Sequence, residues 1–205
     1  MPDHNAMPAS LNDNLYRNVA FASILWFCLT FIVVHIVRDD LSLWRQTLSI
    51  YAVGPAGWLL TTGFYSVAIT QLLIAYRLFQ WRQTAGDLLV VTLLVLAAVG
   101  TVLVAIFPYT IKTPHNIGAA MHLILFPLFL WLHVWLHRHD VLWTFSVVMA
   151  ALSTAALLLL IWNGETDYNL GTSAMAQKAE IFVIALWLLV YTWRSPTLRP
   201  VARSG

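Results

Sequence analysis

Residues 88–111 read LLVVTLLVLAAVGTVLVAIFPYTI, a stretch of 24 residues without Asp, Glu, Lys or Arg. A helix needs roughly 20 apolar residues to cross the hydrocarbon core of a bilayer. Further uncharged runs of comparable length cover 18–37, 46–76, 113–137 and 141–164, and a shorter one covers 181–193. This pattern predicts six transmembrane helices, at 19–37, 57–77, 88–108, 114–137, 141–162 and 175–193.

The composition of the whole chain also indicates an integral membrane protein. Of its 205 residues, 60% are hydrophobic and only 10% are charged, whereas roughly a quarter of the residues of a soluble domain are charged. A transmembrane β-barrel would show short alternating segments, and the runs of this chain are continuous. The predicted fold class is therefore all-α, a polytopic membrane protein built as a bundle of six transmembrane helices. The net charge of +2 gives no case for a nucleic-acid partner.

We interpret the chain as one transmembrane domain, residues 19–193, between a polar cytoplasmic N-terminus, 1–18, and a basic cytoplasmic tail, 194–205. Lysine and arginine accumulate on the cytoplasmic side of membrane proteins, so their distribution predicts orientation. An N-terminus inside the cell places seven on the inner side and four on the outer side. The seven are Arg17, Arg77, Arg82, Arg138, Arg194, Arg199 and Arg203, and the four are Arg38, Arg45, Lys112 and Lys178. We therefore expect both termini in the cytoplasm and a multi-pass protein of the cell (inner) membrane.

Histidines and acidic residues gather at the predicted outer end of the bundle. In the fourth predicted span, His122 lies about 10 Å deeper than His115, at 1.5 Å of rise per residue. Ionisable residues at such depth usually face the bundle interior or a cavity. We therefore expect an outer-facing polar vestibule formed by His35, Asp39, Asp40, His115, His122, Glu165 and Asp167. The plainer alternative is that His122 only bonds a hydroxyl or carbonyl group of a neighbouring helix.

Small and hydroxyl-bearing residues recur in the second predicted span. Thr62, Ser66 and Thr70 are spaced four residues apart, so they share one helix face. Together with Gly63 and with Gly100 of the third span, this face is typical of helix–helix packing. Lining of a pocket is the alternative interpretation.

The inner end carries a second pair of histidines, His133 and His137. Their spacing of four residues could hold a metal ion, but beside Arg138 at the headgroup level an interfacial role is favoured, and no metal site is predicted. His35 and His122 are the one pair deep enough for bis-histidine haem ligation, and a single pair without a further match gives little support. No cofactor is therefore predicted.

Three stretches together resemble an uncharacterised prokaryotic family of membrane proteins, domain of unknown function 998. They are LSLWRQTLSIYAVGPAGWLLTTGFY at 41–65, VGTVLVAIFPYTIKTPHNIGAAMHLILF at 99–126 and QKAEIFVIALWLLVY at 177–191. The resemblance covers nearly the whole chain and implies a six-helix integral membrane protein without an established activity. It marks His122, the Gly54-Pro55 turn and Gly100 as family positions. Members often carry an acidic residue after Phe-Pro, where this chain has Tyr109 and Thr110, and this departure argues against a shared acidic catalytic site.

The leading functional hypothesis is non-enzymatic: binding or passage of a lipid or small amphiphile, or an accessory role with a partner in a membrane complex. The alternative is a metal-dependent lipid hydrolase that uses the outer histidines with Asp39, Asp40 or Asp167. A secondary transporter is the third hypothesis, although the broken helices and inverted repeats of many transporters are not visible. Nucleophile elbows, phosphate loops and zinc-protease signatures are absent from the sequence, which favours a protein that is not an enzyme.

Overall fold

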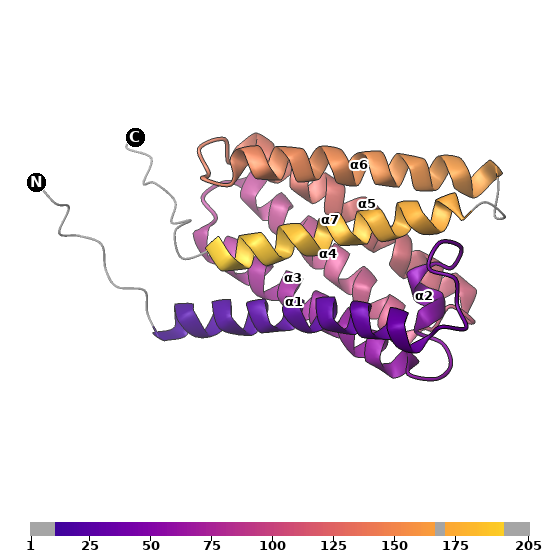
Figure 1. The fold of residues 1–205 in the computed structure, drawn as a ribbon. Helices are drawn as coiled ribbons and strands as arrows, with labels where there is room; N and C mark the ends of the chain where they lie inside the picture. The colour runs from indigo at the N-terminus through magenta and orange to yellow at the C-terminus, as the bar shows by residue number, and fades with distance from the viewer. Residues whose placement is uncertain (1–10, 167–170, 195–205) are drawn as a thin grey trace, which may run out of the picture.

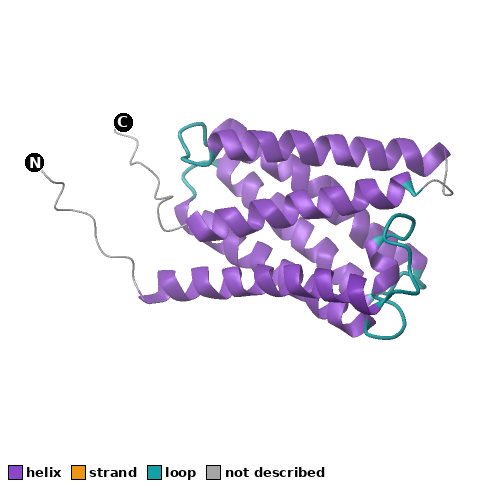
Figure 2. Cartoon of the chain, viewed as in Figure 1, coloured by secondary structure: helices purple, strands orange, loops and turns teal. Residues whose placement is uncertain are grey.

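The computed structural model describes residues 11–166 and 171–194, and every regular element in this part of the chain is a helix (Figures 1 and 2). Six helices are long and apolar enough to cross a membrane. They are α1 (Leu11–Val37), α3 (Gly57–Trp81), α4 (Ala85–Ile106), α5 (Lys112–Leu136), α6 (Trp143–Thr166) and α7 (Thr172–Arg194). The single turn α2 (Leu48–Tyr51) lies between the first two. The prediction of an all-α fold with six apolar spans is confirmed, and these spans indicate a multi-pass membrane protein.

The ends of several helices differ from the prediction, which followed only the apolar runs. Helix α1 begins at Leu11, because the polar residues before the apolar run continue the helical hydrogen bonding. Helix α4 begins at Ala85 because Thr84 and Asp87 form a capping box. The Thr84 hydroxyl accepts from the Asp87 backbone at 3.2 Å, and the Asp87 carboxylate accepts from the Thr84 backbone at 2.8 Å.

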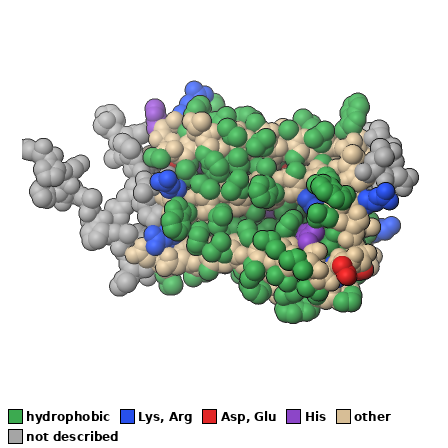
Figure 3. Space-filling view, in the orientation of Figure 1, with side chains coloured by type: hydrophobic (Ala, Val, Ile, Leu, Met, Phe, Trp, Pro, Cys, Tyr) green, Lys and Arg blue, Asp and Glu red, His purple; other side chains and the backbone are tan. Residues whose placement is uncertain are grey.

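The six spans form a ring in chain order, and α7 closes the ring by packing against α1 (Figure 1). Helix α1 begins and α7 ends at the same end of the bundle, which we call the terminal end. The opposite end carries α2 and the connection from Arg38 to Ala56, and we call it the α2 end. Large apolar side chains cover the visible outer face between the two ends (Figure 3), as expected of a surface that contacts lipid.

Aromatic side chains fill the centre of the ring. Trp187 of α7 is fully buried and meets the rings of Phe126 and Phe129 edge-on, at centroid distances of 5.9 and 5.3 Å. Its indole N–H donates to the Ser146 hydroxyl of α6 at 3.0 Å. Trp187 thereby connects α7 to α5 through ring packing and to α6 through a hydrogen bond.

Glycines allow α4 and α5 to approach each other closely. A Cβ atom on Gly100 would lie 2.6 Å from the carbonyl oxygen of Gly118 and 2.7 Å from the backbone nitrogen of His122. A Cβ atom on Gly118 would likewise lie 2.7 Å from the carbonyl oxygen of Gly100. The two backbones are therefore in direct contact at this crossing, and the crossing lies beside the polar groups described below.

The hydroxyl-bearing face of α3 lies against α1. Gly63 leaves room for the side chain of Thr30, and the Thr62 hydroxyl accepts from the indole N–H of Trp26 at 3.1 Å. The Thr70 hydroxyl lies 3.2 Å from the carbonyl oxygen of Ala20, and Ser66 is buried with its hydroxyl donating to Gly63. Gly100, grouped with these residues in the sequence interpretation, belongs instead to the α4–α5 contact.

Candidate functional site

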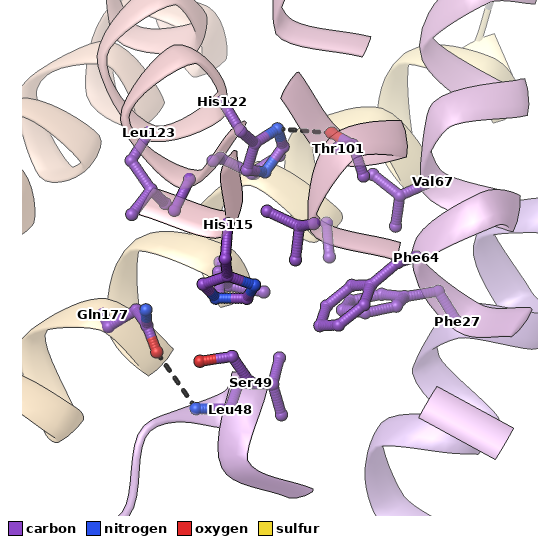
Figure 4. Close-up of a pocket in the computed structure, with 15 residues that line it drawn as sticks. Phe27, Leu48, Ser49, Phe64, Val67, Thr101, His115, His122, Leu123 and Gln177 are labelled. Carbon is purple, nitrogen blue, oxygen red and sulfur yellow. Dashed lines mark hydrogen bonds between the residues drawn. The ribbon is translucent and has the colours of Figure 1, made fainter. Parts of the chain in front are cut away.

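A cavity lies at the α2 end of the bundle, enclosed by helices that are distant in sequence (Figure 4). Its volume is about 40 Å³. The walls are mainly apolar: Phe27 of α1, Leu48 of α2, Phe64 and Val67 of α3, Val104 of α4, Ala119 and Leu123 of α5, and Ile181, Ile184 and Ala185 of α7. Five polar side chains interrupt them: Ser49, Thr101, His115, His122 and Gln177. The site therefore combines an apolar wall with a few converging polar groups.

His122 is held by a buried polar network that ties three helices together. Its Nδ1 lies 2.8 Å from the Thr101 hydroxyl of α4 and 3.5 Å from the amide nitrogen of Gln71 on α3. The Thr101 hydroxyl also lies 3.1 Å from the amide oxygen of Gln71 and 3.0 Å from the carbonyl oxygen of Ala97. With Nδ1 engaged on the α4 side, Nε2 of His122 lies on the cavity side of the ring (Figure 4).

His115 lines the same cavity about two helical turns closer to the α2 end than His122. Its Nδ1 lies 2.8 Å from the carbonyl oxygen of Phe107, at the end of α4. A carbonyl oxygen accepts and never donates, so Nδ1 carries the hydrogen and Nε2 of the neutral ring is an acceptor. The ring of Tyr109 packs edge-on against His115 at 5.8 Å. Both histidines are therefore fixed in orientation by their Nδ1 atoms.

The connection between α1 and α3 covers this end of the bundle and contributes Leu48 and Ser49 to the cavity wall. The amide oxygen of Gln177 accepts from the Leu48 backbone at 3.0 Å, and the Lys178 ammonium donates to the carbonyl oxygen of Leu43 at 2.6 Å. Two residues at the start of α7 thus fasten the connection over the cavity.

An ion pair fastens the same connection from the other side. Arg38 donates to both carboxylate oxygens of Asp40, at 2.8 and 2.9 Å, and also to the carbonyl oxygen of Val53. The hydrogen bonds from Arg38 hold the pKa of Asp40 below its ordinary value. The carboxylate of Asp40 is therefore committed to Arg38 and does not line the cavity.

The structure brings together only part of the predicted vestibule. His115 and His122 share the cavity, whereas His35 lies outside its lining, with its Nδ1 2.7 Å from the carbonyl oxygen of Phe31 and its ring 4.3 Å from that of Tyr51. Asp39 is exposed. Glu165 belongs to α6 without a described side chain, and Asp167 lies outside the described residues. The acidic half of the predicted vestibule thus does not reach the cavity in the described part of the chain.

Three polar lining residues, Ser49, Thr101 and Gln177, were not singled out from the sequence. Thr101 could have been identified as a candidate polar site residue, since it is an uncharged polar residue in the middle of an apolar run. Gln177 and Ser49 lie in two of the stretches that resemble the family, but the sequence does not place them in a cavity, because their position depends on how α2 folds back onto α7.

The two histidines of the terminal end make separate contacts with acidic side chains. His133 and His137 stack at a centroid distance of 4.6 Å. Nε2 of His133 lies 3.7 Å from Asp140, and Nε2 of His137 lies 3.3 Å from Asp87 at the start of α4. Within 11–166 and 171–194, no group of three or more His, Cys, Asp or Glu residues is arranged to hold a metal ion.

Comparison with known proteins gives one match. The chain matches the family described as "Protein of unknown function (DUF998)" over residues 21–194. No curated protein and no solved structure matches it. The matched segment begins within α1 and ends with the last residue of α7, so it includes both cavity histidines and the Gly100–Gly118 crossing. The resemblance expected from the three sequence stretches is confirmed, and the chain belongs to this family of unknown function.

Proposed function

We propose that the protein binds a lipid or small amphiphile and holds the polar end of that molecule in the cavity at the α2 end. One observation carries the proposal: polar side chains from α2, α4, α5 and α7 converge in a hollow whose remaining walls are apolar. Ligand sites for small molecules commonly have this composition, because apolar walls provide affinity and a few polar groups fix orientation. A molecule with one polar end and an apolar body matches both parts.

The size of the cavity defines how such a molecule is held. A volume of about 40 Å³ accommodates a few water molecules or one small polar group. The apolar body must then lie between the helices or in the surrounding bilayer. Phe27 of α1 and Ile181 of α7 line the cavity at the seam where the ring closes, and this seam is the least extensive contact between neighbouring spans. We propose this seam as the side from which the polar end enters.

The orientation in the membrane forms part of the proposal. The distribution of lysine and arginine supports an N-terminus and a C-terminus in the cytoplasm, flanking a single membrane domain at 19–193. The α2 end and its cavity then face the outer side of the cell membrane. Reporter fusions after Gln83 and after Arg194 test this: both are expected to give a cytoplasmic signal, and a fusion at Arg45 an external one. The reverse pattern contradicts the orientation.

A cavity-filling substitution tests the binding function. Ala119 lines the cavity, whereas its neighbour Ala120 is exposed on the outside of α5. We expect wild-type protein and the Ala120→Leu variant to retain the same co-purified lipids after detergent extraction, as measured by mass spectrometry. The Ala119→Leu variant, once shown to unfold at a similar temperature, is expected to lose them. Equal lipid content in all three proteins contradicts the proposal.

A metal-dependent lipid hydrolase and a secondary transporter are the other candidate activities. No contact among the described residues favours either over binding. The lining of the cavity holds two histidines without an acidic partner, which is an incomplete set for a hydrolytic metal site. Binding therefore remains the activity that the geometry supports best.

A further inference from the structure

The cavity has no charged group among the described residues that line it. None of the fifteen lining residues is Asp, Glu, Lys or Arg. Lys178, next to the lining residue Gln177, donates to the carbonyl oxygen of Leu43, and Arg38 pairs with Asp40. A charged headgroup in the cavity would lose its hydration without gaining a counter-ion from Asp, Glu, Lys or Arg, which is a large free-energy cost in an apolar enclosure.

The two histidines offer hydrogen-bond acceptors to a ligand. Nδ1 of His115 donates to the carbonyl oxygen of Phe107, which leaves Nε2 as an acceptor. The contacts of Thr101 determine which nitrogen of His122 carries the hydrogen. The hydroxyl hydrogen of Thr101 is directed to the oxygens of Ala97 and Gln71, which only accept, so we infer that Nδ1–H of His122 donates to the Thr101 oxygen at 2.8 Å. The amide nitrogen of Gln71, 3.5 Å from Nδ1, then makes no hydrogen bond to it. Nε2 of His122 is then an acceptor as well.

The remaining polar groups of the cavity complement these acceptors. The amide oxygen of Gln177 is engaged by the Leu48 backbone, so its amide nitrogen keeps two hydrogens for donation. The Ser49 hydroxyl can either donate or accept. The cavity therefore presents two imidazole acceptors and an amide donor. Two neighbouring hydroxyl groups, which together donate two hydrogens and can also accept without carrying charge, satisfy this set.

We propose that the cavity selects an uncharged, hydroxyl-bearing head, such as the glycerol end of a monoacylglycerol, over phosphate, carboxylate and ammonium heads. The inference rests on the proposed function and specifies its ligand. Each hydroxyl hydrogen would reach a histidine Nε2, and a hydroxyl oxygen would accept from Gln177. The acyl chain would follow the apolar side chains of α1 and α7 that line the cavity.

A competition experiment tests the selectivity. The full chain in detergent is loaded with radiolabelled monooleoylglycerol and separated by gel filtration. Oleyl alcohol, oleic acid, oleoyl lysophosphatidic acid and oleylamine, which share the chain length and differ in the head, are then added at equal mole fraction in the micelle. Oleyl alcohol is expected to compete. The three charged amphiphiles are expected to compete at least about ten-fold less well, because burial of an unpaired polar or charged group costs more than about 1.4 kcal/mol.

Histidine variants test the acceptor assignment. His115→Leu removes the acceptor and is expected to weaken retention by about ten-fold, the effect of leaving one buried hydroxyl unpaired. His115→Gln keeps an oxygen or nitrogen near the former Nε2 position and is expected to recover part of the loss, which a purely structural role would not produce. His139→Leu, an exposed position at the terminal end, serves as control.

The outcomes separate the two proposals. Retention of no amphiphile, charged or uncharged, overturns the proposed function. Equal or stronger competition by the charged amphiphiles overturns the selectivity and leaves amphiphile binding intact. Wild-type retention by His115→Leu overturns the acceptor role of that histidine.

Discussion

Substitution of Gly100 by alanine probes the contact that positions both sides of the candidate site. The new Cβ atom would lie 2.6 Å from the carbonyl oxygen of Gly118 and 2.7 Å from the backbone nitrogen of His122. Ordinary carbon contacts lie at about 3.5–4.0 Å, so α4 and α5 must separate by roughly 1 Å. Because the obstructing atoms belong to the backbone, no rotamer change relieves the overlap. Overpacking of this kind costs about 1–3 kcal/mol.

The same displacement disrupts the cavity network. The bond between Thr101 and Nδ1 of His122 is 2.8 Å long, and a further 1 Å takes it beyond the usual hydrogen-bond range of about 2.7–3.2 Å. We therefore expect the Gly100→Ala variant to lose ligand retention as well as stability. Reversible unfolding in mixed detergent micelles, followed by tryptophan fluorescence, measures the free energy of unfolding.

Gly86, near the start of the same helix, provides the matched control. A Cβ atom there would meet the end of the Leu136 side chain at 2.9 Å, which a flexible side chain can relieve. Both variants replace a helical glycine by alanine, so to first order their difference reports the packing cost. If Gly100→Ala unfolds with the same free energy as Gly86→Ala, the proposed direct backbone contact between α4 and α5 is wrong.

Two further substitutions have expected outcomes. Asp40→Asn removes the carboxylate that holds Arg38, so hydrogen exchange of the backbone at 41–53 should accelerate. The wild-type contact should be intact above the ordinary pKa of 3.8 and lost as pH falls through the lowered pKa of Asp40. Protection of 41–53 relative to the intrinsic exchange rate should fall over the same range, and protection independent of pH contradicts the assignment. Trp187→Phe removes a buried indole and its hydrogen bond, and should cost roughly 1–3 kcal/mol of unfolding free energy. Trp193→Phe, at an exposed position, should cost little, and equal effects would contradict the central role of Trp187.

The six spans could be predicted from the sequence because long apolar runs without charged residues are typical of helices that contact lipid. The run at 88–111 has no charged residue over a length that crosses a bilayer, and α4 occupies most of it. Helix ends were less predictable, since capping and local hydrogen bonding determine them. Thr84 and Asp87, for example, start α4 before the apolar run begins.

The candidate site could be predicted only in part, for a physical reason. His122 was identifiable because an ionisable group deep in a span requires a polar partner. Its partner Thr101 lies on another helix, and the pairing depends on the rotation of α4 against α5 at the Gly100–Gly118 crossing. Asp39 and Asp40 lie in the connection at the α2 end, but Asp40 pairs with Arg38 in its own segment. Residue type indicated a polar region, and only the tertiary contacts distinguish lining residues from loop residues.

Photolabelling measures most directly whether the cavity holds an amphiphile. Cells that express the protein are supplied with a fatty acid bearing a diazirine near its carboxyl end, which enters many lipid classes, and are then irradiated. Mass spectrometry of the purified protein locates the cross-linked residues. Our account predicts cross-links on lining residues of α5 and α7, such as Ala119 and Ile181, and their loss in the Ala119→Leu variant but not in Ala120→Leu. Cross-links confined to the lipid-facing surface, or unchanged in Ala119→Leu, would contradict it.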